Sequence, residues 1–129
     1  MCGFVGIVNY KKDISKYKEI LINMNNTLSK RGPDEDGYYI SQNVGLGHKR
    51  LIVIDPKGGK QPMVEKYTYG EYVIVYNGQI YNTKELRKTL EENNFEFTGH
   101  CDTEILLKSY IHYVIQKNKN YLWHVTTLA

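Results

Sequence analysis

Apolar residues recur along the chain at spacings that predict three helices. Over residues 14–30 they fall three or four positions apart, as the buried face of an α-helix requires. This first stripe consists of Ile14, Tyr17, Leu21, Met24 and Leu28, with Ile20 widening it. A second helix is expected to begin at Asn82, which forms a capping-box pattern with Glu85, and to extend to about Asn93. A third is expected over residues 103–116, with an inner stripe of Leu106, Tyr110, Tyr113 and Val114.

Shorter segments rich in β-branched and aromatic residues predict strands between these helices. They cover residues 3–10, 37–41, 44–55 and 72–76. Gln42 and Asn43 separate the second and third segments and form the expected turn of a hairpin. Strands that follow one another closely, with helices before and after them, indicate one α+β domain with antiparallel sheets and helices on the sheet faces.

The composition describes an ordinary globular domain. Hydrophobic residues make up 41% and charged residues 24% of the 129 positions, which excludes collagen-like, low-complexity and disordered chains. No apolar run approaches the roughly 18 residues that a membrane span needs, and the first residues lack the basic region of a signal peptide. We therefore expect a cytoplasmic protein that does not bind membranes.

The formal charge of +3 is unevenly distributed along the chain. All 14 acidic residues lie at or before Glu104, so the last 25 residues carry only the basic Lys108, Lys117 and Lys119. Three lysines among apolar residues are too sparse to predict a nucleic-acid surface. The two cysteines belong to no CxxC pair and the histidines lack the spacing of zinc ligands, so no metal site is expected either.

Cys2 is the first candidate for catalytic chemistry, because removal of Met1 would make it the N-terminal residue. Its free α-amine, with a reference pKa of about 7.7–8.0, could then take the proton of a thiol whose reference pKa is about 8.5. One residue would thus supply both the nucleophile and the base of an acyl transfer.

Further candidates could complete a site for such a reaction. Asn77 and Gly78 offer an amide side chain and an open backbone N–H to an oxyanion, although the same pair after a strand is also a common hairpin turn. Arg50 lies inside an apolar strand, where its charge needs a partner. Asp102 precedes a helix, where its ordinary role is to cap the helix. An arginine and an aspartate together could hold a zwitterionic substrate.

The motifs that carry these residues resemble class II glutamine amidotransferases, which are N-terminal-nucleophile hydrolases. The resemblance is closest to the glutaminase domain of glutamine-dependent asparagine synthetases. It rests on MCGFVG at 1–6, RGPD at 31–34, HKRLIVID at 48–55, GKQP at 59–62, NGQIYN at 77–82 and DTE at 102–104. The motifs come in the family's order and cover residues 1 to about 111.

The resemblance implies a role for each candidate residue. Cys2 attacks the side-chain amide carbon of glutamine, Asn77 and the Gly78 N–H hold the oxyanion, and ammonia leaves as a thioester forms. Arg50 binds the α-carboxylate of the substrate, and Asp102 pairs with its α-ammonium. The other implied substrate-binding residues are Leu51, Ile52, Val53, Ile54 and Gln79. The implied fold is an αββα sandwich of two antiparallel sheets, and this domain needs no cofactor.

Two residues depart from the family pattern within the site. Gln79 stands where the family usually has glutamate, which removes a negative charge near the substrate ammonium and predicts weaker binding of glutamine. Ile52 stands where serine is common, at a position that binds through its backbone.

The family pattern fades near Tyr113, which divides the chain into a partial glutaminase domain over 1–112 and a divergent basic tail over 113–129. The resemblance implies that the sandwich is incomplete at its C-terminal end and leaves exposed strand edges. It also implies that the synthetase domain, with its ATP and Mg²⁺, is absent. A second chain could supply the missing strands or the synthetase domain, and a homodimer could cover the edges.

The sequence is therefore compatible with two functions. The chain is either a glutaminase domain that hydrolyses glutamine, or a non-catalytic remnant of the same family that binds glutamine or a partner. Cys2 favours the first, and the absence of the family's later strands favours the second.

Overall fold

The computed structural model describes residues 1–53 and 57–116. Its strands are β1 (Gly3–Val8), β2 (Glu35–Ile40), β3 (Val44–Arg50), β4 (Met63–Tyr67) and β5 (Gly70–Ile74). Its helices are the short 3-10 helix η1 (Ser15–Tyr17) and the α-helices α1 (Lys18–Asn26), α2 (Thr83–Glu92) and α3 (Asp102–Gln116). Helices and antiparallel strands in this order confirm the α+β class.

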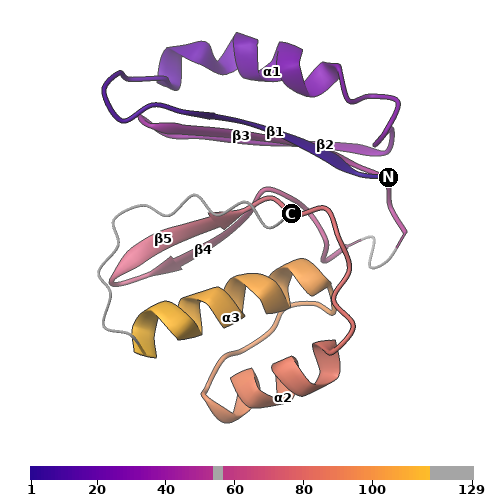
Figure 1. The fold of residues 1–129 in the computed structure, drawn as a ribbon, viewed down its shortest axis with the longest axis vertical. Coiled ribbons are helices and arrows are strands. Elements are labelled where there is room, and N and C mark those ends of the chain that lie inside the picture. The colour runs from indigo at the N-terminus through magenta and orange to yellow at the C-terminus, as the bar shows by residue number, and fades with distance from the viewer. Residues whose placement is uncertain (54–56, 117–129) are drawn as a thin grey trace.

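The described elements form four stacked layers (Figure 1). Helix α1 covers one face of a three-stranded sheet of order β1-β3-β2, and the β4–β5 hairpin faces the other side of this sheet. Helix α3 lies against β5, and α2 packs on α3. All strand pairs are antiparallel.

Strand β3 organises the first sheet because both neighbouring strands pair with it. Gly3 of β1 lies opposite Lys49, and Glu35 of β2 lies opposite Arg50. Side chains alternate between faces along a strand. The face that carries Gly45 and Gly47 therefore contacts α1, while His48 and Arg50 point toward the second sheet.

Several predicted boundaries differ from the structure. The first helix is only Lys18–Asn26 plus the 3-10 turn, and Ile20 of the predicted stripe is exposed. Asn82 makes no side-chain capping hydrogen bond to α2, so the capping box does not form. Strand β4 was not predicted; its sequence mixes charged and apolar residues, and the hairpin partner β5 stabilises it.

The predicted inner face of α3 holds only in part: Val114 is buried and Leu106 and Tyr110 are half-buried, but Tyr113 is wrong. Tyr113 is 51% exposed. The buried side chains are instead Thr103, Glu104, Ile105, Leu107, Lys108, Ile111 and Val114. Because α3 contacts both β5 and α2, it buries a wider surface than a single apolar stripe, and part of that surface is polar.

The buried charges on α3 are paired. The Glu104 carboxylate accepts hydrogen bonds from the backbone N–H groups of Thr98 and Gly99, at 2.8 and 2.9 Å. Lys108 Nζ lies 2.7 Å from a carboxylate oxygen of Glu65 on β4. Such pairing offsets the cost of removing these charges from water, and it fixes α3 relative to the hairpin.

Gly32 allows the loop after α1 to lie directly on β3, which provides a first prediction. A Cβ atom at this position would collide with backbone atoms of Lys49 and Arg50, which cannot move without disturbing the sheet. We expect Gly32→Ala to lower the free energy of unfolding by about 1–3 kcal/mol in chemical denaturation. Gly45→Ala is the control, because its new methyl would meet only side chains, at 3.4 Å or more, in ordinary van der Waals contact. Equal losses in both variants would contradict this account.

The burial of His48 makes stability depend on pH. Burial lowers the pKa of His48 below its ordinary value, and it outweighs the effect of the Tyr76 backbone, which favours the charged ring. As pH falls below about 6.5, the unfolded chain takes up a proton that the folded chain resists. The free energy of unfolding should therefore fall with pH in this window, and His48→Gln should show a shallower slope. An unchanged slope would contradict the assignment to His48.

Candidate active site

The Cys2 thiol is held at the end of the first sheet, beside the end of β3. Cys2 directly precedes β1, and the pairing of Gly3 with Lys49 places Cys2 opposite Arg50. The Leu51 N–H lies 3.3 Å from Cys2 Sγ, and the thiol lies 3.5 Å from the Leu51 carbonyl oxygen. The predicted strand extended to residue 55, but β3 ends at Arg50. These contacts explain the difference, because the Leu51 N–H points to the thiol and not to a neighbouring strand.

The following N–H is also taken by a side chain. Ile52 donates a 2.7 Å hydrogen bond to the Asp34 carboxylate, and the Asp34 N–H donates to the Arg50 carbonyl at 3.0 Å. The RGPD segment is therefore bound to the end of β3 by its aspartate and by the close approach of Gly32. In this way the segment fixes the chain next to Cys2.

Arg50 is buried and paired on the inner side of the sheet. Its guanidinium lies 2.9 Å from the carboxylate of Glu35, directly opposite on β2. This hydrogen bond holds the pKa of Glu35 below its ordinary value, with a further contribution from Lys60. The charge partner that the sequence required for Arg50 is thus Glu35.

The Asn77–Gly78 segment is attached to the beginning of α3 through side-chain hydrogen bonds. Gln61 Oε1 accepts the Tyr76 N–H at 2.5 Å, and Gln61 Nε2 donates to Thr103 Oγ1 at 3.0 Å. Asp102 Oδ2 accepts the Ile80 N–H at 3.0 Å. These bonds replace strand pairing after Ile74, so the segment leaves the hairpin as a loop and β5 ends earlier than predicted.

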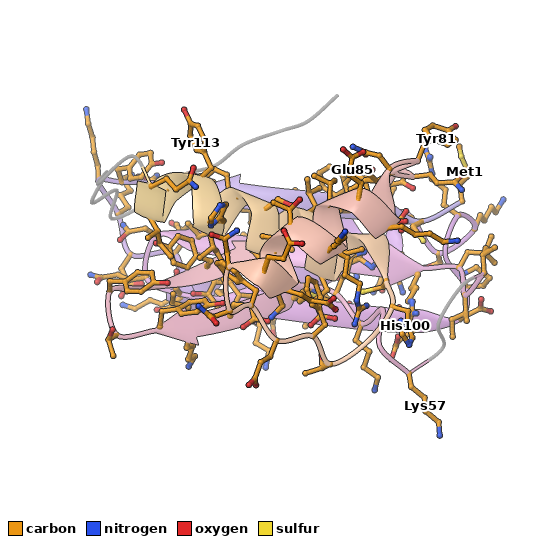
Figure 2. The ribbon with its side chains drawn as sticks, turned by 90° about the horizontal axis from the view of Figure 1, so that it is seen from below. Met1, Lys57, Tyr81, Glu85, His100 and Tyr113 are labelled. Carbon is orange, nitrogen blue, oxygen red and sulfur yellow. The ribbon has the colours of Figure 1, made fainter. Side chains whose placement is uncertain are left out.

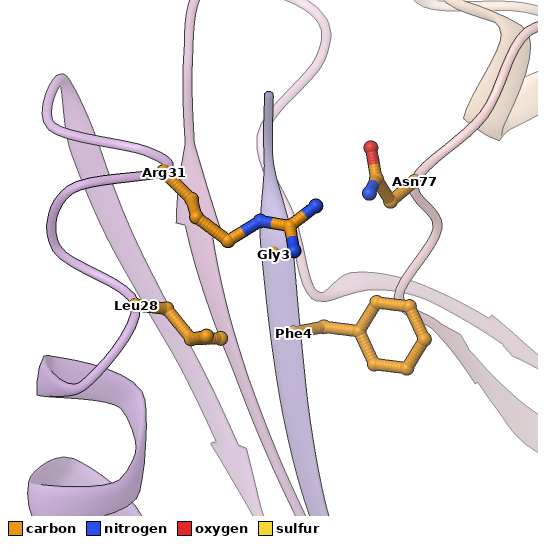
Figure 3. Close-up of a pocket in the computed structure, with 5 residues that line it drawn as sticks. All are labelled: Gly3, Phe4, Leu28, Arg31 and Asn77. Atoms are coloured by element: carbon orange, nitrogen blue, oxygen red, sulfur yellow. The ribbon is translucent and has the colours of Figure 1, made fainter.

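An open pocket of about 170 Å³ lies between the first sheet and this loop. It is lined by Gly3, Phe4, Leu28, Arg31 and Asn77. Figure 3 shows the Arg31 guanidinium and the Asn77 amide on opposite sides of the opening, with the Phe4 ring below them. The structure therefore brings Asn77 to the strand that follows Cys2, although they are 75 residues apart in sequence.

Four of the lining residues, Gly3, Phe4, Leu28 and Arg31, were not among the predicted site residues. Arg31 belongs to the RGPD motif, but the motif by itself indicates only a polar turn. Phe4 is 42% exposed although it lies on a strand, and Leu28 faces Gly3 beyond the end of α1. Their proximity to Asn77 depends on the packing of layers, which no local pattern encodes.

The other predicted residues that the structure describes do not line this pocket. Ile52 and Val53 are exposed after the end of β3, at 38% and 79%. Gly78 and Gln79 are exposed in the loop after Asn77. Ile54, like residues 117–129 of the predicted tail, lies outside the described residues.

Met1 is bound to the backbone of Arg31, whose side chain lines the pocket. Its ammonium donates a 3.1 Å hydrogen bond to the Arg31 carbonyl oxygen. Figure 2 shows Met1 and Tyr81 toward the same end of the molecule, with Tyr113 toward the other. While Met1 is attached, the Cys2 nitrogen is an amide and cannot act as a base.

The described residues include neither a cluster of metal ligands nor a helix that could span a membrane. Over 1–53 and 57–116, no group of three or more His, Cys, Asp or Glu side chains is arranged to hold a metal ion. In the same part of the chain, no helix is long and apolar enough to span a bilayer.

Comparison with known proteins identifies the family. Residues 1–120 match the model of the glutamine amidotransferase domain. The chain is 47% identical over 111 residues to asparagine synthetase [glutamine-hydrolyzing] 3 of Bacillus subtilis, covering 86% of this chain. It is 38% identical over 127 residues to a putative asparagine synthetase [glutamine-hydrolyzing] 2 of Methanocaldococcus jannaschii, covering 85% of this chain.

A plant relative, asparagine synthetase [glutamine-hydrolyzing] 1 of Arabidopsis thaliana, is 34% identical over 102 residues. The chain spans only 18%, 24% and 17% of the lengths of these three relatives. The similarity therefore concerns one part of much longer proteins. On the strength of the match over residues 1–120, the chain belongs to the glutamine amidotransferase domain family.

Proposed function

We propose that this chain, once Met1 is removed, hydrolyses glutamine to glutamate and ammonia through a thioester on Cys2. The observation that carries the proposal is the position of Cys2. It directly precedes Gly3, which lines a pocket together with Asn77, and its thiol contacts the Leu51 N–H, next to Arg50. A nucleophile, a cation and an amide donor at one end of the sheet fit acyl transfer from a small amino acid. The family and the names of the relatives favour glutamine as that substrate.

The proposed chemistry begins with the free α-amine of Cys2. The amine takes the thiol proton, and the sulfur attacks the side-chain amide carbon of glutamine as the carbonyl π pair moves to oxygen. The Asn77 amide and the Gly78 N–H stabilise this oxyanion. The protonated amine returns its proton to the leaving nitrogen, the C–N bond breaks, and ammonia departs. Water then adds to the thioester, releasing glutamate and restoring the thiol.

Binding of the substrate is divided among charged side chains. Arg50 and Arg31 hold the α-carboxylate, with Glu35 keeping the Arg50 guanidinium in place by its 2.9 Å contact. Asp102 pairs with the α-ammonium through the oxygen that does not accept the Ile80 N–H. Gln79 adds no charge here, so Asp102 carries most of the recognition of the ammonium.

In the longer relatives, we propose that the ammonia passes to a synthetase domain that uses ATP and Mg²⁺. This chain would then depend on a second polypeptide, or on a further part of its own protein, to use the ammonia. Two features support such a partner. Among the described strands, β1 is an edge strand that pairs only with β3. Its side chains Phe4 and Val8 are exposed. A non-catalytic, partner-binding fragment is the second candidate on the same observation.

Covalent labelling separates these two functions. The probe is a glutamine analogue with a diazoketone in place of the side-chain amide, followed by intact mass measurement. We expect loss of Met1 and one modification at Cys2 that excess glutamine prevents. Cys2→Ala should remain unlabelled, which also excludes Cys101 as the reacting thiol. Labelling that glutamine does not slow, or retention of Met1 in every molecule, would contradict the enzyme and favour the non-catalytic fragment.

A residue that stabilises the oxyanion and a residue that binds the α-carboxylate should have different effects on the kinetics. Asn77→Ala should lower kcat by about 10²–10³ with little change in KM, because the oxyanion forms only during reaction. Arg50→Lys should raise KM about tenfold, since an ammonium cannot replace a planar guanidinium that already pairs with Glu35. Steady-state glutamate release measures both parameters. The opposite pattern, with Asn77→Ala affecting only KM, would exclude Asn77 from the oxyanion site.

A further inference from the structure

The aromatic ring of Tyr76 folds back over Gly78. A Cβ atom built on Gly78 would lie 2.5 Å from Tyr76 Oη and 2.7 Å from Cζ, closer than atoms can pack. The end of the phenol therefore lies directly against the Gly78 backbone. No side chain larger than hydrogen fits at residue 78 while the ring keeps this position.

The backbone on both sides of Gly78 is also fixed. The Tyr76 N–H donates to Gln61 Oε1 at 2.5 Å, and the Ile80 N–H donates to Asp102 Oδ2 at 3.0 Å. Between these two anchors, the Gly78 N–H makes no hydrogen bond with the other described residues, and the Tyr76 ring packs against this peptide group. A free glycine would otherwise sample many backbone conformations.

The electrostatic surroundings keep the Tyr76 hydroxyl neutral. Partial burial raises the pKa of Tyr76 above its ordinary value, and the negative charge of Asp102 raises it further. The side chain therefore stays uncharged at neutral pH, and it adds no negative charge beside the place where the oxyanion forms.

We propose that Tyr76 is a positioning residue that holds the Gly78 N–H in the direction required to stabilise the oxyanion. The inference rests on the proposed glutaminase function and adds to it a residue that acts through the Gly78 backbone. We assign this action to the ring, because its Cζ and Cε2 atoms lie against Gly78 beside the nearer Oη atom.

The test compares two ligands of the chain that begins at Cys2. Glutamate measures binding of the substrate's α-carboxylate and α-ammonium without an oxyanion. The γ-aldehyde of glutamate measures the oxyanion as well: Cys2 Sγ bonds to the aldehyde carbon, the carbonyl π pair moves to oxygen, and the thiol proton passes to the α-amine. The dissociation constants of both ligands are obtained by calorimetry for each variant, and circular dichroism verifies folding.

We expect Tyr76→Ala to weaken aldehyde binding about tenfold or more and to leave glutamate binding within about twofold. Tyr76→Phe should recover the aldehyde affinity, because it restores the ring. Tyr72→Ala is the matched control, since it truncates a tyrosine of β5 that packs against Tyr110, at 6.5 Å between ring centroids, and it should change neither constant. Gly78→Ala provides a second route, because its new methyl must displace the Tyr76 ring; it should repeat the selective loss.

Three outcomes would overturn the proposal. Equal weakening of both ligands by Tyr76→Ala would indicate general damage to the pocket, and unchanged binding of both would show that Gly78 needs no support. Failure of Tyr76→Phe to recover the aldehyde affinity would assign the effect to the hydroxyl. A starting chain that binds the aldehyde no more tightly than glutamate would instead refute the glutaminase function itself, and the role of Tyr76 with it.

Discussion

The pairing of β1 with β3 is the constraint on which the site depends. Its register places Cys2 opposite Arg50, and the end of β3 then supplies the Leu51 N–H to the thiol. A shift of one residue would move every β1 side chain to the other face of the sheet and would separate the thiol from the Leu51 N–H. The half-buried side chains of Val5 and Ile7 oppose such a shift, because Val5 packs beside Gly47 and Asn25 on the α1 face.

The second half of the site is attached to this sheet by hydrogen bonds from side chains. Gln61 and Asp102 accept backbone N–H groups on either side of Asn77, while Gln61 also bonds to Thr103 on α3. A loop held in this way presents Asn77 to the pocket without belonging to a sheet. Helix α3, with its paired Glu104 and Lys108, therefore contributes to the site although it lies two layers away from Cys2.

The sequence predicted the fold class and the family better than the boundaries of the elements and the residues that meet in the pocket. The α+β order followed from hydrophobic spacing, and the family was recognised from motifs that the comparisons confirm. The early end of β3 was not predictable, because Asp34 and Cys2 capture N–H groups across long stretches of chain. Arg31 was missed for a similar reason: only the stacking of layers shows that it faces Asn77.

The most direct test of this account is the rate at which the chain beginning with Cys2 converts glutamine. Glutamate and ammonia are measured separately, beside a Cys2→Ala chain prepared in the same way. The account predicts equal amounts of the two products, formed by the chain with Cys2 and absent above background with Ala. Release that is the same in both chains, or absent from both although Met1 is removed and the chain is folded, would contradict the claim that this end of the sheet is a glutaminase site.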